Sequence, residues 1–259
     1  MNTIRLLTGL AICLSLSACG SDTPASGCAA GDRFELLWQD DFDGDAIDPQ
    51  RWEKATHTFA ENEAQFRADN VQVRDGVMEL SLSLSGNESK PYFGGELRTF
   101  DTFTYGRFET RAKLAYAPAA ISSFFTFYDE ADFVSNWQEI DFEIVGRGDK
   151  ERQVQANVIS NNFGARLEQE FVAETAFAPA DDFHTYAFEW TPESVVFFID
   201  GAEVHQSTSL LTRKLTDGQK LLMNLWVANI TSWAGDPEPA VTSQAVAQYD
   251  YVSVSRLCP

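Results

Sequence analysis

Basic residues, histidine and cysteine are scarce in this sequence of 259 residues. Only 19 lysines and arginines stand against 39 aspartates and glutamates, and the formal net charge is −20. Such a surface repels phosphate backbones, so we exclude nucleic acid as a partner and disfavour polyanionic polysaccharides. The three histidines, His57, His184 and His205, lack the spacing of metal ligands, and we expect them to make structural hydrogen bonds. A neutral ligand fits this composition better than a charged one.

Long apolar runs are also missing, apart from one near the N-terminus. A short basic start is followed by about a dozen apolar residues over 6–17, too few to span a membrane as a mature helix. The run ends in Leu-Ser-Ala-Cys, which resembles a bacterial lipobox with Cys19 as the lipidated residue. We predict a signal peptide over residues 1–18 and a flexible tether over residues 19–31, with ordinary signal cleavage as the alternative. Gly20, by resemblance to Gram-negative lipoproteins, favours the outer membrane.

The four cysteines leave one pair for the folded domain. Cys13 lies in the predicted signal and Cys19 in the lipobox, so Cys28 and Cys258 remain, one near each end of the domain. Exported cysteine pairs are usually oxidised, and the termini of compact domains often lie close together. We therefore predict a Cys28–Cys258 disulfide, with two free thiols as the alternative.

No stretch has a helical period of convincing length, whereas short runs with strand character recur. These runs are 34–38, 77–84, 106–114, 122–128, 139–145, 153–160, 185–190, 195–199, 221–227 and 248–255. The dipeptides Asp75-Gly76 and Asp200-Gly201 lie between apolar runs and predict tight hairpins. The pattern predicts an all-β fold of two stacked antiparallel sheets, a β-sandwich or jelly roll, as one catalytic domain over residues 32–259.

One predicted strand carries an unusual acidic face. In Trp-Gln-Glu-Ile-Asp-Phe-Glu-Ile-Val-Gly over 137–146, Glu139, Asp141 and Glu143 alternate with apolar residues and so share one face. The outer Cα atoms lie about 13 Å apart, and glutamates that lean inward bring their carboxyl groups to about 5 Å. That is the spacing of a retaining glycosidase. A solvated sheet face is the alternative, but three like charges without interleaved basic residues make a poor one.

Ten blocks of sequence, in order, resemble one family. They are DDF at 40–42, WEKA at 52–55, FRADNV at 66–71, GELR at 95–98, SSFF at 122–125, the acidic strand, FHTYAFEW at 183–190, IDG at 199–201, MNLW at 223–226 and YDY at 249–251. The chain is similar to glycoside hydrolase family 16, above all to the bacterial lichenases, which are endo-β-1,3-1,4-glucanases. The resemblance covers about Leu37 to Arg256 and implies a concanavalin-like jelly roll.

The resemblance implies a role for each carboxylate of the acidic strand. Glu139 matches the nucleophile, Glu143 the acid/base, and Asp141 the aspartate that assists the nucleophile. Some members of the family have one extra residue, a β-bulge, before the last glutamate. This chain lacks that residue, which groups it with lichenases and xyloglucan-active relatives. A two-carboxylate mechanism needs no cofactor.

The resemblance also implies a set of sugar-binding residues: Trp137, Glu96, Arg98, Asn157, Asn224, Trp226 and Trp233. The alternative for Glu96 and Arg98 is a surface ion pair, and for the others it is packing or buried amide hydrogen bonding. The loop at 56–65 does not align with the family. Two cleft tyrosines of lichenases correspond to Phe127 and Ile159, which removes hydroxyl groups that would select a particular glucan.

The resemblance further suggests a structural calcium ion held by hard oxygen ligands. Asp250 matches the aspartate of that site, with Gly76 and Asp41 as candidate carbonyl donors. The alternative is that Asp250 is a surface residue at the end of a strand.

Together these features predict a monomeric, lipid-anchored, retaining endo-glycosidase that hydrolyses a neutral β-1,3-1,4-glucan. The main alternative substrate is a bacterial exopolysaccharide such as succinoglycan. A non-catalytic glycan-binding lipoprotein is a second alternative, although it would not need both glutamates at this spacing. A transglycosylase is a third, because sequence does not distinguish water from a sugar as the acceptor.

Overall fold

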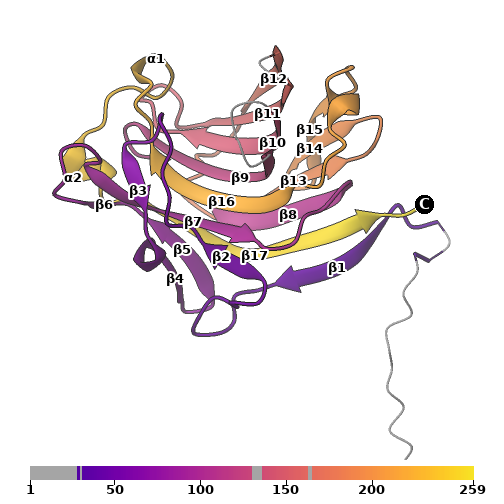
Figure 1. Cartoon of the computed structure of the whole chain (residues 1–259), viewed down its shortest axis with the longest axis horizontal. Helices are drawn as coiled ribbons and strands as arrows, with labels where there is room; N and C mark the ends of the chain where they lie inside the picture. The colour runs from indigo at the N-terminus through magenta and orange to yellow at the C-terminus, as the bar shows by residue number, and fades with distance from the viewer. Residues whose placement is uncertain (1–27, 30, 130–135, 163–164) are drawn as a thin grey trace, which may run out of the picture.

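The computed structural model describes residues 28–29, 31–129, 136–162 and 165–259. Two sheets stack face to face (Figure 1). The first sheet has the order β15 (Ala202–Ser207), β14 (Val195–Ile199), β13 (His184–Trp190), β8 (Gly106–Lys113), β17 (Val246–Leu257), β5 (Val77–Ser81) and β4 (Val71–Arg74), and β1 (Phe34–Asp40) also pairs with β17. The predicted all-β, two-sheet fold is confirmed.

The second sheet, here called the cleft sheet, is curved, and its concave face points away from the first sheet (Figure 1). Its order is β12 (Ala165–Glu174), β11 (Gln153–Asn162), β10 (Asn136–Val145), β9 (Ala120–Asp129), β16 (Lys220–Val227), β7 (Tyr92–Thr99) and β2 (Trp52–Lys54), with β3 (Ala64–Phe66) and β6 (Ser83–Leu84) also paired to β7. Its pairings are antiparallel except for β3 with β7. The described helices are single turns: α1 (Thr231–Ala234), α2 (Pro239–Thr242) and the 3-10 turns η1 (Ala68–Asn70) and η2 (Thr212–Lys214).

Alternation along β10 explains how the core forms. Ile140, Phe142 and Ile144 are fully buried and point into the space between the sheets. The Phe142 ring packs edge-on against Tyr186 at 5.8 Å and Phe197 at 5.2 Å, both from the first sheet. Full burial of side chains of this size contributes roughly 1.5–3 kcal/mol each. Because the apolar residues of β10 must face this core, its acidic residues must face the other way.

The predicted hairpins are present, and each predicted strand run contains a strand, with 77–84 divided into β5 and β6. Asp75 and Gly76 have φ values of 53° and 75° between β4 and β5, and Asp200 and Gly201 have 48° and 75° between β14 and β15. These positive angles suit the tight turns that match the twist of paired strands. Strand β12 was not predicted, because it lies at a sheet edge and most of its side chains are exposed on both faces.

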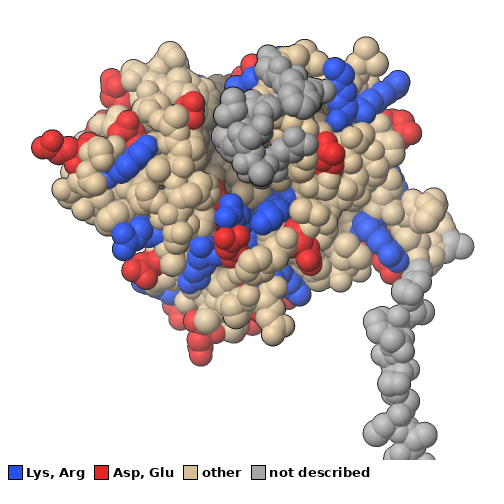
Figure 2. Space-filling model, viewed as in Figure 1, with Lys and Arg blue, Asp and Glu red and all other residues tan. Residues whose placement is uncertain are grey.

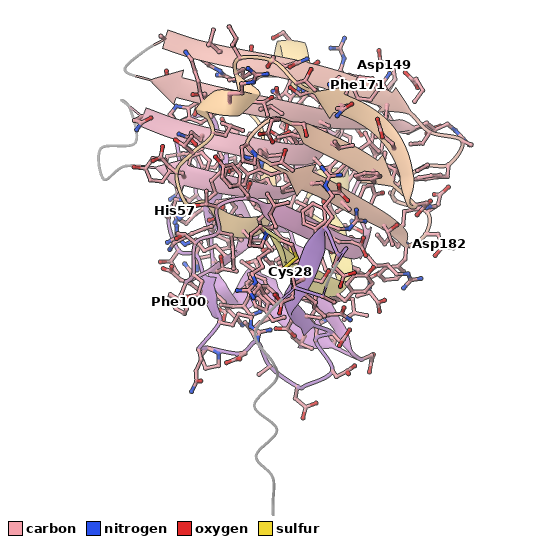
Figure 3. All side chains as sticks on the ribbon, turned by 90° about the vertical axis from the view of Figure 1, so that its right-hand side faces the viewer. Cys28, His57, Phe100, Asp149, Phe171 and Asp182 are labelled. Carbon is pink, nitrogen blue, oxygen red and sulfur yellow. A yellow bond between two sulfur atoms is a disulfide. The ribbon has the colours of Figure 1, made fainter. Side chains whose placement is uncertain are left out.

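The two termini of the sandwich are joined covalently. The predicted disulfide between Cys28 and Cys258 is present, with Cα atoms 5.8 Å apart, and Cys28 lies where the chain enters the sandwich (Figure 3). Pairing of β1 with β17 brings the two cysteines together. Cys19 and the predicted signal over 1–18 lie outside the described residues, so the domain division remains a prediction. Within the part that the structure describes, no helix is long and apolar enough to cross a bilayer.

Candidate functional site

The three acidic residues of β10 lie on the concave face of the cleft sheet. Glu139 and Glu143 are half-buried and Asp141 is only 2% exposed. Their backbone neighbours on β9 and β11 are Phe127 and Ile159 beside Glu139, Phe125 and Asn157 beside Asp141, and Ser123 and Gln155 beside Glu143. In the space-filling view, basic and acidic side chains are interspersed over the described surface (Figure 2).

Burial and mutual repulsion favour the protonated forms of Glu139 and Asp141. Burial raises the pKa of Glu139 to about 8; the charge of Glu143 adds to this rise and Arg166 opposes it. Burial also raises the pKa of Asp141 well above its usual range, and the two glutamates raise it further. Its Oδ1 is buried and has no hydrogen-bond partner in the described structure. A protonated Asp141 could therefore donate a hydrogen bond from a position that is otherwise unsatisfied.

Glu143 has a raised pKa that lies close to neutral pH, so its protonated and ionised forms have similar populations there. Burial raises its pKa to about 7, Glu170 raises it further, and Lys150 lowers it. Removal from water is the larger cause, ahead of repulsion between carboxylates. A carboxyl group with a pKa near the working pH is suited to general acid and base chemistry.

Glu96 and Asn224 lie together on the floor of the same face. Asn224 pairs with Ser123 on one side and Glu96 on the other, so both lie in one row with Glu143 across β10, β9, β16 and β7. The Asn224 amide donates to Glu96 Oε2 at 3.3 Å, and both residues are buried. A row of polar groups that crosses the strands from Glu143 can contact successive units of a bound chain.

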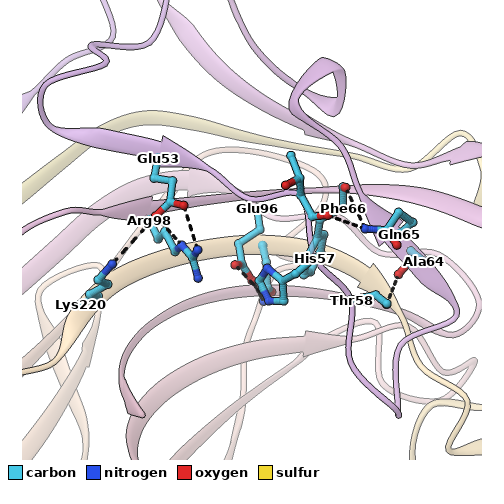
Figure 4. A network of polar contacts seen from close by, with 11 residues as sticks. Glu53, His57, Thr58, Ala64, Gln65, Phe66, Glu96, Arg98 and Lys220 are labelled. Carbon is cyan, nitrogen blue, oxygen red and sulfur yellow. Dashed lines mark hydrogen bonds and ion pairs between the residues drawn. The ribbon is translucent and has the colours of Figure 1, made fainter. Parts of the chain in front are cut away.

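Arg98 makes an ion pair with Glu53, and its sugar-binding role stays a prediction. Its guanidinium donates to both carboxylate oxygens of Glu53 at 3.0 Å, and Lys220 Nζ lies 3.9 Å from Glu53 Oε2 (Figure 4). The hydrogen bond from Arg98 is the main reason why the pKa of Glu53 is lowered. Glu53 and Lys220 were not singled out in the sequence, because nothing local marks them as partners of Arg98.

His57 is a further cleft residue that the sequence did not assign to the site. It is exposed, its Nε2 lies 3.9 Å from Glu96 Oε1, and its ring packs against Phe66 (Figure 4). The other two histidines are elsewhere: His184 Nδ1 lies 2.7 Å from Asp200 Oδ2, and His205 stacks on Phe171 at 4.5 Å. His57 lies in the loop that does not align with the family, so no motif could have identified it.

The predicted sugar-binding tryptophans differ in how far their side chains are exposed to solvent. Trp137 is half-buried on the same face as Glu139, with its ring 5.9 Å from Phe127 and the Arg166 guanidinium over it at 5.4 Å. Trp226 is only 7% exposed.

Packing explains the burial of Trp226. Its ring lies between Phe59 at 4.9 Å and Trp233 at 6.1 Å, in a small apolar cluster at one end of the concave face. This packing is the alternative that we had considered for Trp226, and its sugar-binding role stays a prediction. Trp233 is partly exposed, and its indole N–H donates to Gln155 Oε1 at 3.1 Å.

Asn157 is buried, and its side-chain Oδ1 accepts the backbone N–H of Val158 at 2.9 Å. This is the local amide hydrogen bonding that we had considered as the alternative. Asn157 is nevertheless the direct β11 neighbour of Asp141 on the concave face, so a sugar-binding role stays a prediction.

The predicted calcium ligands converge through strand pairing. Tyr249 pairs with Met78 of β5 and Val252 with Asp40 of β1, which places Asp250 near the strand ends that carry Gly76 and Asp41. Carboxylate and carbonyl oxygens fit calcium.

The Asp250 carboxylate, however, pairs with Arg111 at 2.8 Å, so this guanidinium competes with a cation. Among the residues that the structure describes, no three His, Cys, Asp or Glu side chains could hold a metal ion together. The calcium site stays a prediction.

Comparison with known proteins gives consistent matches. A family model for glycosyl hydrolases family 16 matches residues 58–252. A β-glucanase of Brevibacillus brevis is 35% identical over 196 residues, which is 74% of this chain and 72% of that protein. A β-glucanase of Acetivibrio thermocellus is 34% identical over 208 residues, 80% of this chain, and the chain spans 59% of its length.

A solved structure agrees with these sequence matches. The crystal structure of a prokaryotic β-1,3-1,4-glucanase (lichenase) derived from a mouse hindgut metagenome has a TM-score of 0.74 at 32% identity, covering 85% of this chain and 99% of that one. The residues matched by the family model include all three carboxylates of β10.

Proposed function

The chain belongs to glycosyl hydrolase family 16, and from this premise we propose that it hydrolyses internal bonds of a β-1,3-1,4-glucan with retention of configuration. The resemblance to β-glucanases supports a β-glucan as the substrate, and the solved lichenase supports the mixed linkage. The specific linkage and the roles of individual residues are parts of this proposal.

The observation that carries the proposal is the unbroken pairing of β10. From Glu139 to Glu143 the strand pairs residue for residue with both β9 and β11, so the two glutamates are four residues apart on a regular strand. Their Cα atoms are then about 13 Å apart. Side chains that lean inward bring the carboxyl groups to the separation of about 5–5.5 Å that a retaining mechanism needs.

We propose a double displacement. Ionised Glu139 attacks the anomeric carbon while Glu143 gives its proton to the leaving glycosidic oxygen, which forms a covalent glycosyl-enzyme and frees one chain end. Glycosylation removes the negative charge of Glu139, so Glu143 loses its proton more readily and acts as a base on water. Water then opens the ester bond and Glu143 recovers its proton.

Asp141 supports the nucleophile in this proposal. The raised pKa of Glu139 means that most of the free enzyme holds a proton on this residue at neutral pH. A protonated Asp141, adjacent on the same face, can donate a hydrogen bond to the Glu139 carboxylate and stabilise its ionised form. The buried, unsatisfied Oδ1 of Asp141 agrees with such a role.

Two side chains beside the nucleophile favour a second candidate substrate. Phe127 and Ile159 are the direct backbone neighbours of Glu139, and by the sequence resemblance they correspond to cleft tyrosines of lichenases. Apolar contacts there cannot select sugar hydroxyl groups by hydrogen bonding. An endo-β-glycanase for a bacterial exopolysaccharide such as succinoglycan is therefore the second candidate. We also propose export and lipid anchoring at Cys19, from the sequence pattern.

The test is an assay of the chain from residue 20 onward against barley β-glucan, laminarin, carboxymethyl cellulose, xyloglucan and succinoglycan. Release of short oligosaccharides from barley β-glucan alone supports the mixed-linkage proposal, and release from succinoglycan alone supports the second candidate. Glu139→Ala should abolish release while circular dichroism stays unchanged. Full activity of that variant would show that the assigned nucleophile is wrong.

A further inference from the structure

Glu143 is bordered by a hydrogen-bonded link that the catalytic proposal does not use. Its β11 neighbour Gln155 is 7% exposed and makes two side-chain hydrogen bonds. Gln155 Nε2 donates to Glu170 Oε2 of β12 at 2.6 Å, and Gln155 Oε1 accepts from the Trp233 indole at 3.1 Å. A buried amide with both ends bonded has a fixed orientation, so it holds the Glu170 carboxylate on the same sheet face as Glu143, two strands away.

Lys150 contacts Trp233, the same residue that donates a hydrogen bond to Gln155. Its ammonium group donates to the backbone carbonyl of Trp233 at 3.3 Å. Lys150, Gln155 and Glu143 line one small cavity. One tryptophan of α1 therefore contacts both the amide that orients an acidic residue and the ammonium group of a basic one.

The remaining groups around Glu143 are few. Asp141 and Glu139 share its strand face, and β9 contributes the uncharged Ser123. After burial, the charge of Glu170 raises the pKa of Glu143 and that of Lys150 lowers it. The two flanking charges thus act on the same carboxyl group in opposite directions.

We propose that Glu170 and Lys150 are positioning residues for the acid/base step: the Glu170 charge holds the proton on Glu143, and the Lys150 charge opposes it. This inference rests on the proposed role of Glu143. The Gln155–Trp233 link keeps both charges in place, so the acid form of Glu143 depends on side chains of β12 and of the β10–β11 turn as well as on its own strand.

The chain contains a matched control for Glu170. Glu174 is an exposed glutamate of the same strand, and it accepts a hydrogen bond from Gln153 of β11 at 2.7 Å, as Glu170 does from Gln155. Glu174→Gln removes the same charge from an equivalent bond. If the proposal is right, Glu170→Gln should shift the pH dependence of the reaction and Glu174→Gln should not.

The experiment measures kcat/KM against pH for the wild type, Glu170→Gln, Lys150→Met and Glu174→Gln. Loss of the Glu170 charge should move the alkaline limb of the profile, where the acid loses its proton, to lower pH. Glu170 lies two strand spacings from Glu143, about 10 Å, and a charge at that distance should shift the limb by about half a pH unit. Lys150→Met should move it higher and Glu174→Gln should leave it in place. Because Glu170 is exposed, the shift should shrink in 0.5 M salt. An unmoved limb in Glu170→Gln, or equal shifts in Glu170→Gln and Glu174→Gln, overturns the proposal.

A second measurement does not depend on the substrate. In the chain labelled with 13C-glutamate, the side-chain carboxyl resonance of Glu143 is identified by its loss in Glu143→Gln and then titrated. The midpoint should fall in Glu170→Gln and rise in Lys150→Met, and unchanged midpoints in both overturn the inference. Failure to cut any glucan would refute the proposed function, whereas this titration would still decide the role of the two charges.

Discussion

Replacing the proposed nucleophile should make the protein more stable. Glu139 has a pKa of about 8 in the folded chain against a usual value of 4.5, so folding disfavours its ionised form. A raised pKa contributes stability below the unfolded value, and this contribution is lost as pH rises from 4.5 to 8. At pH 7 the linkage amounts to about 3 kcal/mol. Glu139 is half-buried, so solvent screening makes the contribution smaller than this figure.

Glu139→Gln keeps the shape of the side chain and removes this cost. We expect its free energy of unfolding at pH 7 to exceed that of the wild type by about 1–3 kcal/mol. At pH 4, where the wild-type glutamate is protonated in both states, the gain should vanish. The exposed loop residue Glu88 supplies the control, since Glu88→Gln should change stability by less than about 0.5 kcal/mol at either pH.

The assay is urea unfolding with the disulfide intact, followed by tryptophan fluorescence at pH 7 and pH 4. An unchanged slope of free energy against urea would show that the variant alters stability rather than the unfolded state. A gain of equal size at both pH values would contradict the argument, because the cause would then be packing rather than ionisation. No gain at pH 7 would show that the folded cleft tolerates the charged carboxylate.

Three further predictions concern other parts of the molecule. Glu143→Ala should slow cleavage of an unactivated glucan by about 10²–10⁴-fold but spare the first-turnover burst of dinitrophenol from the matching aryl glycoside, because that leaving group needs no proton. Loss of the burst as well would reassign Glu143. Replacing Cys28 and Cys258 by serine opens a bridge of sequence separation 230 and should cost up to about 5 kcal/mol in urea unfolding; a loss below about 1 kcal/mol would contradict the chain-entropy argument. Asp250→Asn should abolish a calcium-dependent rise in Tm measured by calorimetry, and a wild type without such a rise would refute the calcium site.

Features that depend on neighbouring positions along the chain could be predicted. The shared face of Glu139, Asp141 and Glu143 follows from alternation on a strand, and the burial of Ile140 and Phe142 follows from the same alternation. The two Asp-Gly hairpins were predictable for the same reason, since a tight turn is specified by its own residues.

Features that depend on strand order and register could not be predicted from the sequence. No local pattern indicated that Arg98 would pair with Glu53, or that His57 would lie beside Glu96. Trp226 matched a binding position but is covered by Phe59, which comes from a loop more than 150 residues away in the chain.

The sequence by itself thus determined the fold class, the acidic face of β10 and the cysteine pair that closes the domain. The tertiary structure alone decided which charges surround that face. Glu170 comes from an edge strand whose polar pattern predicted no element, and Lys150 from a turn. Their effect on Glu143 depends on distance in space and on exclusion of water, and both are set only when distant strands pair and pack.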